Sequence, residues 1–156
     1  MKAKVSPVKT TDVKLIERLA TWYLEEWGIP KERTISRLRD YPNEVVLVQL
    51  VLKEGNRIVA TGGLYHTTGL SIIFPEYRAL SPWIAQLYTD KDFRGKGYGA
   101  LLLQSLEEYA QNLGITQVFL FTSTAEKLYK RNGYRQIERL KYRGADTVVM
   151  EKFLKG

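Results

Sequence analysis

The segment from Trp83 to Leu103 constrains the fold of this chain more than any other part of the sequence. An apolar run over 83–89 predicts a strand, a basic stretch with alternating glycines follows it, and a second apolar run from Gly99 predicts a helix. Backbone N–H groups at the start of a helix lack intrahelical partners and lie at the positive end of the helix dipole. Glycines let a ligand approach these groups closely, and Arg94 and Lys96 add positive charge. The segment is therefore predicted to bind a phosphate or pyrophosphate.

The spacing of the glycines separates the kinds of nucleotide loop that this segment could form. The nucleoside triphosphate loop needs Gly-x-x-x-x-Gly-Lys-[Ser/Thr], and no glycine of the chain is followed by Lys and then by Ser or Thr. The dinucleotide pattern Gly-x-Gly-x-x-[Gly/Ala] is present at Gly95, Gly97 and Ala100. That pattern requires an acidic residue about 20 residues further on, where this chain has Phe-Thr-Ser over 121–123. The nucleoside triphosphate loop is therefore excluded, and the dinucleotide-binding loop is disfavoured.

The remaining sequence predicts a mixed α/β arrangement. Apolar residues at helical spacing indicate the helices, and in the first of them Tyr23 and Trp27 lie on the inner side. Alternating or continuous runs of Val, Leu and Phe indicate the strands. The helices are expected over 12–27, 31–39, 99–113 and 124–131, and the strands over 44–53, 57–66, 83–89, 116–122, 134–140 and 146–153. The strand over 116–122 is apolar throughout, which favours a parallel pairing, and residues 67–82 are expected to form a loop.

Composition limits the class of protein. The 156 residues are 44% hydrophobic and contain no apolar run near the length of a membrane span, so we expect one domain over 1–156 with a cytoplasmic location and no membrane partner. Zero Cys and one His exclude thiolate and histidine metal clusters, so no metal is expected. The net charge of +7 indicates an anionic partner, but Lys and Arg are scattered and form no nucleic-acid motif. The sequence does not determine the oligomeric state.

Two motifs carry a resemblance to a known family. Arg94, Gly97 and Gly99 form R-x-x-G-x-G, and residues 122–134 form T-x-x-A-x-x-L-Y-x-x-x-G-Y. The chain resembles the GCN5-related N-acetyltransferase (GNAT) family, whose motifs are [QR]-x-x-G-x-[GA] and N-x-x-A-x-x-L-Y-x-x-x-G-[FY]. It departs from the family at Thr122, where the family often has Asn. The resemblance implies the GNAT fold, a mixed and mostly antiparallel central sheet covered by helices and splayed at the strand over 83–89.

The resemblance also implies an activity and the residues that perform it. The expected reaction transfers an acetyl group from acetyl-CoA, the cosubstrate, to a primary amine by direct attack in a ternary complex. Tyr129 is the family's position for the general acid that protonates the departing thiolate, and a phenol suits that task. The resemblance assigns coenzyme binding to the strand residues Leu87, Tyr88 and Thr89, to the loop residues Arg94, Gly95, Lys96, Gly97, Tyr98, Gly99 and Ala100, and to Thr122 and Tyr129.

The general base and the acceptor site are less defined. Glu76 and Asp90 are candidate bases with His66 third, although a solvated loop charge is the simpler interpretation of both carboxylates. Glu26, Trp27 and Trp83 are candidates for binding the acceptor, either a small amine or a protein amine, although Trp27 also has the spacing of a core residue. Two alternatives stay open, an acyl-CoA sensor without catalysis and a basic nucleic-acid-binding module.

Overall fold

A seven-stranded sheet forms the centre of the computed structural model, which describes residues 3–155. The strands are β1 (Ala3–Pro7), β2 (Val46–Glu54), β3 (Arg57–Tyr65), β4 (Trp83–Thr89), β5 (Gln117–Thr122), β6 (Arg135–Tyr142) and β7 (Ala145–Phe153). Their spatial order is β1-β2-β3-β4-β5-β7-β6, and every neighbouring pair is antiparallel except β4 and β5. The predicted mixed, mostly antiparallel sheet is confirmed.

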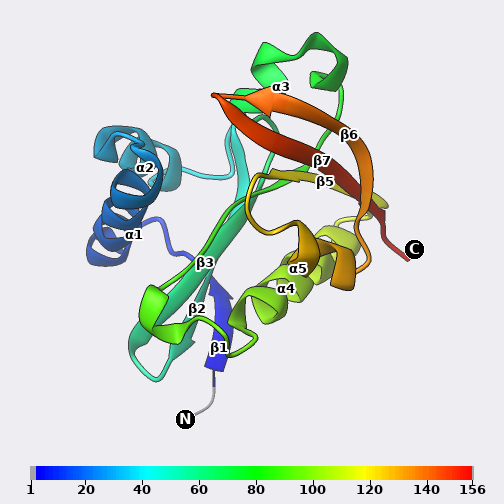
Figure 1. Cartoon of the computed structure of the whole chain (residues 1–156). Coiled ribbons are helices and arrows are strands. Elements are labelled where there is room, and N and C mark those ends of the chain that lie inside the picture. Colours follow the sequence, from blue (N-terminus) through cyan, green and yellow to red (C-terminus); the bar gives the residue numbers. More distant parts are fainter. Residues whose placement is uncertain (1–2, 156) are drawn as a thin grey trace.

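Helices cover both faces of this sheet (Figure 1). On one face, α1 (Val13–Trp27) and α2 (Lys31–Leu38) pack over β2 and β3, while α4 (Tyr98–Asn112) and α5 (Glu126–Arg131) cover the other. The Asp12 carboxylate caps α1 by accepting a hydrogen bond from the Leu15 N–H at 3.2 Å, and α1 ends at Gly28, whose φ of 69° is left-handed. Both ends of α1 therefore follow from local sequence. No helix in residues 3–155 is long and apolar enough to cross a membrane.

The strands β4 and β5 separate almost as soon as they meet. Their parallel pairing consists of Trp83 opposite Phe119, supported by a 3.1 Å hydrogen bond from the Phe119 N–H to the Pro82 carbonyl. On its other side β4 stays paired with β3 as far as Thr89. The register between β3 and β4 shifts at a bulge, where Gln86 has a left-handed φ of 56°. The splay predicted at this strand is confirmed, and the bulge lies within it.

Several elements differ from the sequence-based expectation. Residues 67–82 contain the short helix α3 (Gly69–Ile73), capped by Thr68 and Ser71, and the 3₁₀ turn η1 (Pro75–Tyr77), so the prediction of a loop there was wrong in part. A helix of one turn is too short to show helical periodicity. The edge strand β1 was not predicted, because it has only five residues and ends in a proline, which is unfavourable inside a strand.

Candidate functional site

The loop between β4 and α4 presents a series of free backbone donors. Gly97 precedes the first turn of α4 with a left-handed φ of 82°, and no side chain caps this helix. Among the described residues, no backbone N–H from Arg94 to Ala100 donates a hydrogen bond to another protein group. Gly95 is also left-handed, with φ of 79°. Successive N–H groups in such a turn form a concave site for an anion at the positive end of a helix dipole.

Side chains add charge around this loop. Arg94 Nε donates to the Thr89 carbonyl at 2.9 Å, and its guanidinium lies 5.5 Å from the centre of the Tyr88 ring. Lys96 is exposed, with its ammonium 5.1 Å from the Phe93 ring. Both cations therefore lie beside the free donors and stay accessible to solvent.

The side chain of Tyr98 points to the sheet and contacts β2. Its hydroxyl donates to Glu54 at the end of β2, and this hydrogen bond raises the pKa of Tyr98. The contact ties the start of α4 to the sheet. The structure thus gives the Tyr98 side chain a role in anchoring the loop, while its backbone N–H belongs to the free series.

Beyond Trp83, the edge of β4 that faces β5 has no strand partner among the described residues. Leu87 packs over Gly62 toward α4, and a Cβ atom on Gly62 would lie 2.6 Å from Leu87 Cδ1. The carbonyls of Gln86 and Thr89 accept from Tyr23 and Arg94 side chains. An extended ligand can therefore lie along this edge as an added strand would, next to Leu87, Tyr88 and Thr89.

Tyr129 lies on α5 with its ring buried and its hydroxyl free. The residue is 8% exposed, and its ring meets that of Tyr134 edge-on at 5.9 Å. The hydroxyl has no hydrogen-bond partner in residues 3–155, yet no fully buried polar side-chain atom in that range lacks a partner, so the oxygen reaches the surface. Burial of the ring raises the pKa of Tyr129 to about 12. The phenol is therefore a protonated donor at neutral pH.

The turn before α5 determines where Tyr129 is held. Thr122 Oγ1 accepts hydrogen bonds from the backbone N–H groups of Thr124 at 3.2 Å and of Ala125 at 3.0 Å. The family's Asn would offer a side-chain oxygen for the same purpose, which a threonine hydroxyl also supplies. Thr122, which was predicted to bind the coenzyme, thus uses its hydroxyl oxygen to support the start of α5.

The raised pKa of Tyr129 predicts a loss of stability at alkaline pH. Above about pH 10 the unfolded chain loses the phenolic proton while the folded chain keeps it until about pH 12, so the free energy of unfolding falls with pH in that window. We expect Tyr129→Phe to lose less stability than the wild type between pH 9 and 11.5, by roughly 1–2 kcal/mol. Urea unfolding at the two pH values measures this, and equal losses in both proteins would contradict it.

The two candidate bases lie at opposite ends of β4. Asp90 follows the strand, and its carboxylate accepts from the Asp92 N–H at 3.1 Å with Arg57 Nη2 3.9 Å away. Glu76 lies in η1 before the strand and is exposed. The structure does not bring these carboxylates together. His66 follows β3, where its backbone N–H donates to the Val45 carbonyl at 2.8 Å.

The residues predicted to bind the acceptor divide into two groups. Trp83 is 0% exposed and packs between Tyr77 and Phe119, with Nε1 donating to the Leu80 carbonyl at 2.8 Å. The Trp83 side chain is buried in the core with its N–H satisfied, so it is not open to an acceptor. Trp27 is 43% exposed, although its spacing suggested the core, and Glu26 beside it is exposed.

The Trp27 ring extends an aromatic group that reaches β4. It lies 5.5 Å from the ring of Tyr23 and 6.1 Å from that of Tyr88. Partial burial raises the pKa of Tyr88, Arg94 opposes this, and the Glu26 carboxylate adds to the rise. Trp27 and Glu26 therefore lie on the α1 side of β4, close to Tyr88.

A group of buried polar side chains beneath the bulge was missed by sequence reasoning. Gln49, Thr61 and Tyr65 lie on β2 and β3 and are almost fully buried, and Tyr23 of α1 reaches them from above. The available signal was a single polar residue, Gln49, inside the apolar run of β2. A buried amide must find hydrogen-bond partners, so such a residue predicts a polar network.

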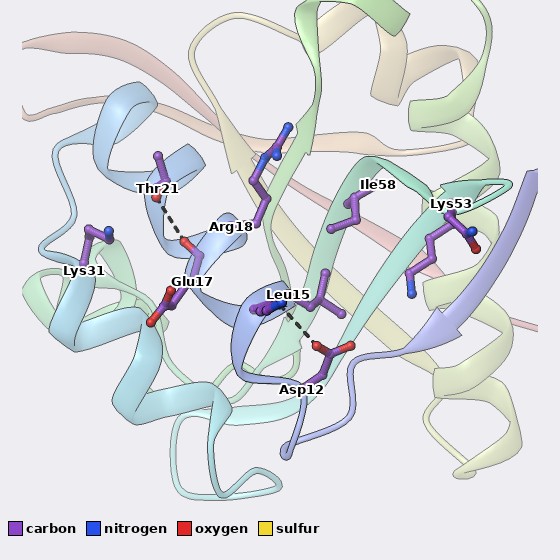
Figure 2. Close-up of a pocket in the computed structure, with 10 residues that line it drawn as sticks. Asp12, Leu15, Glu17, Arg18, Thr21, Lys31, Lys53 and Ile58 are labelled. Carbon is purple, nitrogen blue, oxygen red and sulfur yellow. Dashed lines mark hydrogen bonds between the residues drawn. The ribbon is translucent and has the colours of Figure 1, made fainter.

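A hollow of the surface lies away from these elements. Figure 2 shows it on the α1 side, where it has a volume of about 500 Å³. It is lined by Asp12, Lys14, Leu15, Glu17, Arg18, Thr21, Lys31, Lys53, Asn56 and Ile58. None of these residues belongs to the β4–α4 loop, β4 or α5, and their charges are of both signs. The hollow is therefore separate from the candidate site.

Comparisons with known proteins agree with this geometry. Residues 13–134, which make up most of the chain, match the Acetyltransferase (GNAT) family. The protein therefore belongs to the GNAT acetyltransferase family, and the resemblance seen in its two motifs is confirmed.

Solved structures show the same fold over the whole chain. Ard1 from Thermoplasma volcanium is 16% identical with a TM-score of 0.73, covering 100% of both chains. The ribosomal-protein-S18-alanine N-acetyltransferase from Escherichia coli is 16% identical with a TM-score of 0.69, covering 99% of this chain and 96% of that one. The aminoglycoside 6'-N-acetyltransferase from Enterococcus faecium is 14% identical with a TM-score of 0.74, covering 98% of each. At these identities the similarity shows the fold alone.

Proposed function

We propose that this protein is an acetyl-CoA-dependent N-acetyltransferase that works by direct attack of a primary amine in a ternary complex. The observation that carries the proposal is the series of free backbone donors from Arg94 to Ala100, which lies between α4 and a strand that separates from its neighbour. The loop suits the coenzyme's pyrophosphate, and the open edge of β4 suits its pantetheine arm. Arg94 and Lys96 supply positive charge at the pyrophosphate.

The chemistry needs few groups from the protein. A neutral amine attacks the thioester carbonyl and forms a tetrahedral oxyanion, and the attached nitrogen gives up one proton to the general base. Collapse of the oxyanion then breaks the carbon–sulfur bond and expels the coenzyme thiolate. The thiolate then needs a proton. Tyr129 holds one at neutral pH on a hydroxyl that reaches the surface, so it is the proposed general acid. Holding both substrates in line accounts for much of the remaining rate enhancement.

The acceptor is proposed as a class of amine, and the base as one of two carboxylates. The GNAT proteins of similar fold act on amines as different as a protein alanine and an aminoglycoside, so the acceptor here is either a small amine or a protein amine. Trp27 and Glu26 offer an aromatic face and a carboxylate to a cationic acceptor near Tyr88. Of the two candidate bases, Glu76 has the more accessible carboxylate, since that of Asp90 caps the turn after β4.

Coenzyme A is expected to raise the melting temperature of the wild type by about 5–10 °C at a concentration of about 100 times its Kd. Gly97→Glu should abolish this shift, because a carboxylate at the head of α4 repels the pyrophosphate and fills the loop. Gly114→Glu is the matched control. Gly114 lies at the other end of α4 with a similar left-handed φ of 81° and equally open surroundings, so both variants carry the same backbone strain.

The outcomes of this experiment separate the alternatives. No shift in the wild type, or equal loss of the shift in both variants, would contradict the coenzyme site. A shift without acetylation of any amine, scored by thiol release over a panel of acceptors, would favour the acyl-CoA sensor. Salt-dependent binding to nucleic acid that coenzyme A leaves unchanged would favour the nucleic-acid-binding module.

A further inference from the structure

A network of buried polar groups lies under the bulge of β4. Its members come from four elements, and they are Tyr23 (α1), Gln49 (β2), Thr61 and Tyr65 (β3), and Gln86 (β4). Six short contacts join them to one another and to two backbone carbonyls, as follows: Tyr23 Oη to the Gln86 carbonyl (2.8 Å), Gln49 Nε2 to Tyr23 Oη (2.9 Å) and to Thr61 Oγ1 (2.8 Å), Thr61 Oγ1 to the Leu50 carbonyl (2.7 Å), and Tyr65 Oη to Gln49 Oε1 (3.0 Å) and to Gln86 Oε1 (2.9 Å).

The number of available protons determines how these contacts are made. The three hydroxyls supply one proton each and the Gln49 amide supplies two, which makes five protons for six contacts. Burial raises the pKa of Tyr23 and of Tyr65, so both phenols keep their protons. Reversing the Gln49 amide would leave two oxygens facing each other without a proton at Tyr23. Both side-chain contacts of the Tyr65 hydroxyl are to amide oxygens, and its single proton serves only one of them. Turning the Gln86 amide by 180°, which exchanges its oxygen and nitrogen, supplies the sixth proton, so we assign Gln86 Nε2 to the side that faces Tyr65.

This assignment closes the network into a ring. With the Gln86 amide turned in this way, its Nε2 donates to Tyr65 across the 2.9 Å contact, Tyr65 donates to Gln49, Gln49 donates to Tyr23, and Tyr23 donates back to the Gln86 carbonyl. Both the side chain and the backbone of Gln86 are held by the ring, which stabilises a left-handed φ that a non-glycine residue rarely adopts. A fully satisfied buried network is rigid. The position of the remaining amide atom, Oε1, is thereby determined.

That oxygen is available to a ligand. The outer amide atom of Gln86 has no protein partner, and no fully buried polar side-chain atom in residues 3–155 lacks one, so the atom reaches the surface. Gln86 lies beyond the point where β4 leaves β5, on the face that α1 covers. Tyr129 packs on the opposite face with α4. An acceptor that comes from the α1 side would thus meet Gln86 while the coenzyme thiol meets Tyr129.

We infer that Gln86 is a positioning residue for the acceptor, and that its side-chain oxygen accepts a hydrogen bond from an N–H of the attacking amine. The inference rests on the proposed acetyl transfer. A neutral amide oxygen accepts an N–H but does not take its proton, so Gln86 orients the nitrogen and is not the base. Tyr65 acts through Gln86, because it holds the amide in the required orientation.

Kinetics with two substrates test the role of Gln86. Gln86→Met keeps the shape of the side chain and removes its polar atoms, and we expect it to raise the KM for the amine by about 5- to 10-fold with the KM for acetyl-CoA unchanged within about twofold. Tyr65→Phe should move the same constant in the same direction. Thr61→Val is the control, because Thr61 belongs to the network but lies outside the ring that holds Gln86, so the substitution should lower the melting temperature and leave the KM for the amine unchanged.

The amine used is whichever of spermidine, kanamycin and a peptide with a free N-terminal alanine the wild type acetylates fastest. An active wild type whose KM for that amine is unchanged in Gln86→Met would overturn the role of Gln86 and leave the proposed function standing. A wild type that acetylates none of them would overturn the proposed function and this role together.

The orientation of the amide has an independent test by NMR, which needs no substrate. One side-chain NH₂ proton of Gln86 should exchange slowly with solvent in the wild type and rapidly in Tyr65→Phe, whereas Thr61→Val should leave it slow. Rapid exchange of both protons in the wild type would overturn the ring, whatever the enzyme assays show.

Discussion

Tyr129→Phe should lower kcat by at least about 100-fold while changing the affinity for coenzyme A by no more than about twofold, because the general acid acts only as the thiolate leaves. The variant keeps the buried ring and removes a hydroxyl that has no hydrogen-bond partner in residues 3–155. Its melting temperature should therefore stay close to that of the wild type. Steady-state kinetics for acetyl-CoA and the amine, with calorimetry for coenzyme A, measure the two effects separately.

Tyr134→Phe is the matched control for this variant. The two rings pack edge-on at 5.9 Å, but the Tyr134 hydroxyl donates to the Glu107 carboxylate at 2.7 Å. Removing that donor from a buried carboxylate should cost about 1–3 kcal/mol of stability and leave kcat within about threefold. Wild-type turnover in Tyr129→Phe would remove Tyr129 from the mechanism. A similar loss of kcat in both variants would show that packing around α5 matters, and not the Tyr129 hydroxyl.

The parts of the site that could be predicted from the sequence are those that local geometry determines. Gly95 and Gly97 adopt left-handed φ values, and a turn of this kind before a helix leaves backbone donors free whatever surrounds it. The same holds for the helix boundaries. Asp12 and Gly28 mark the ends of α1 through capping interactions between near neighbours, so α1 was predicted to within one residue.

The parts that could not be predicted depend on contacts between distant residues. Tyr23 is 63 residues from Gln86, whose carbonyl it binds, and the bulge exists only where β3, β4 and α1 meet. Gln49 gave a signal of a polar network but no indication of its partners. Trp27 has the helical spacing of a core residue, yet it is the last residue of α1 and is 43% exposed.

The burial of Trp83 also depends on contacts between residues that are distant in the sequence. In the sequence, Trp83 follows the segment over 67–82 and was predicted to bind the acceptor. In the structure, the single pair that β4 and β5 share places Trp83 against Phe119 and under Tyr77, where its side chain is buried. The point at which the two strands meet is thus packed with aromatic rings, and the divergence begins immediately after it.

Gly63→Ala is expected to destabilise the protein by about 1–3 kcal/mol, which corresponds to a melting temperature lower by roughly 3–10 °C. A Cβ atom there would lie 2.8 Å from the Val48 carbonyl, which is backbone, and 2.5 Å from the ring of Tyr65. Gly63 lets that ring lie flat over β3, with its hydroxyl between Gln49 and Gln86. The substitution should therefore also raise the KM for the amine, since it displaces the group that orients Gln86.

The neighbouring glycine provides the comparison. Gly62 faces the other side of the sheet, and the closest atom to an added Cβ is the end of the flexible Leu87 side chain at 2.6 Å, with Leu87 Cα at 3.4 Å. Leu87 can rotate, and alanine reduces the entropy of the unfolded chain, so Gly62→Ala should cost less than about 1 kcal/mol. Differential scanning calorimetry of both variants tests the pair. If Gly62→Ala proves as destabilising as Gly63→Ala, the loss of stability comes from crowding between the strands in general and not from the Tyr65 ring. If Gly63→Ala leaves the KM for the amine unchanged, the position of the Tyr65 ring does not affect acceptor binding.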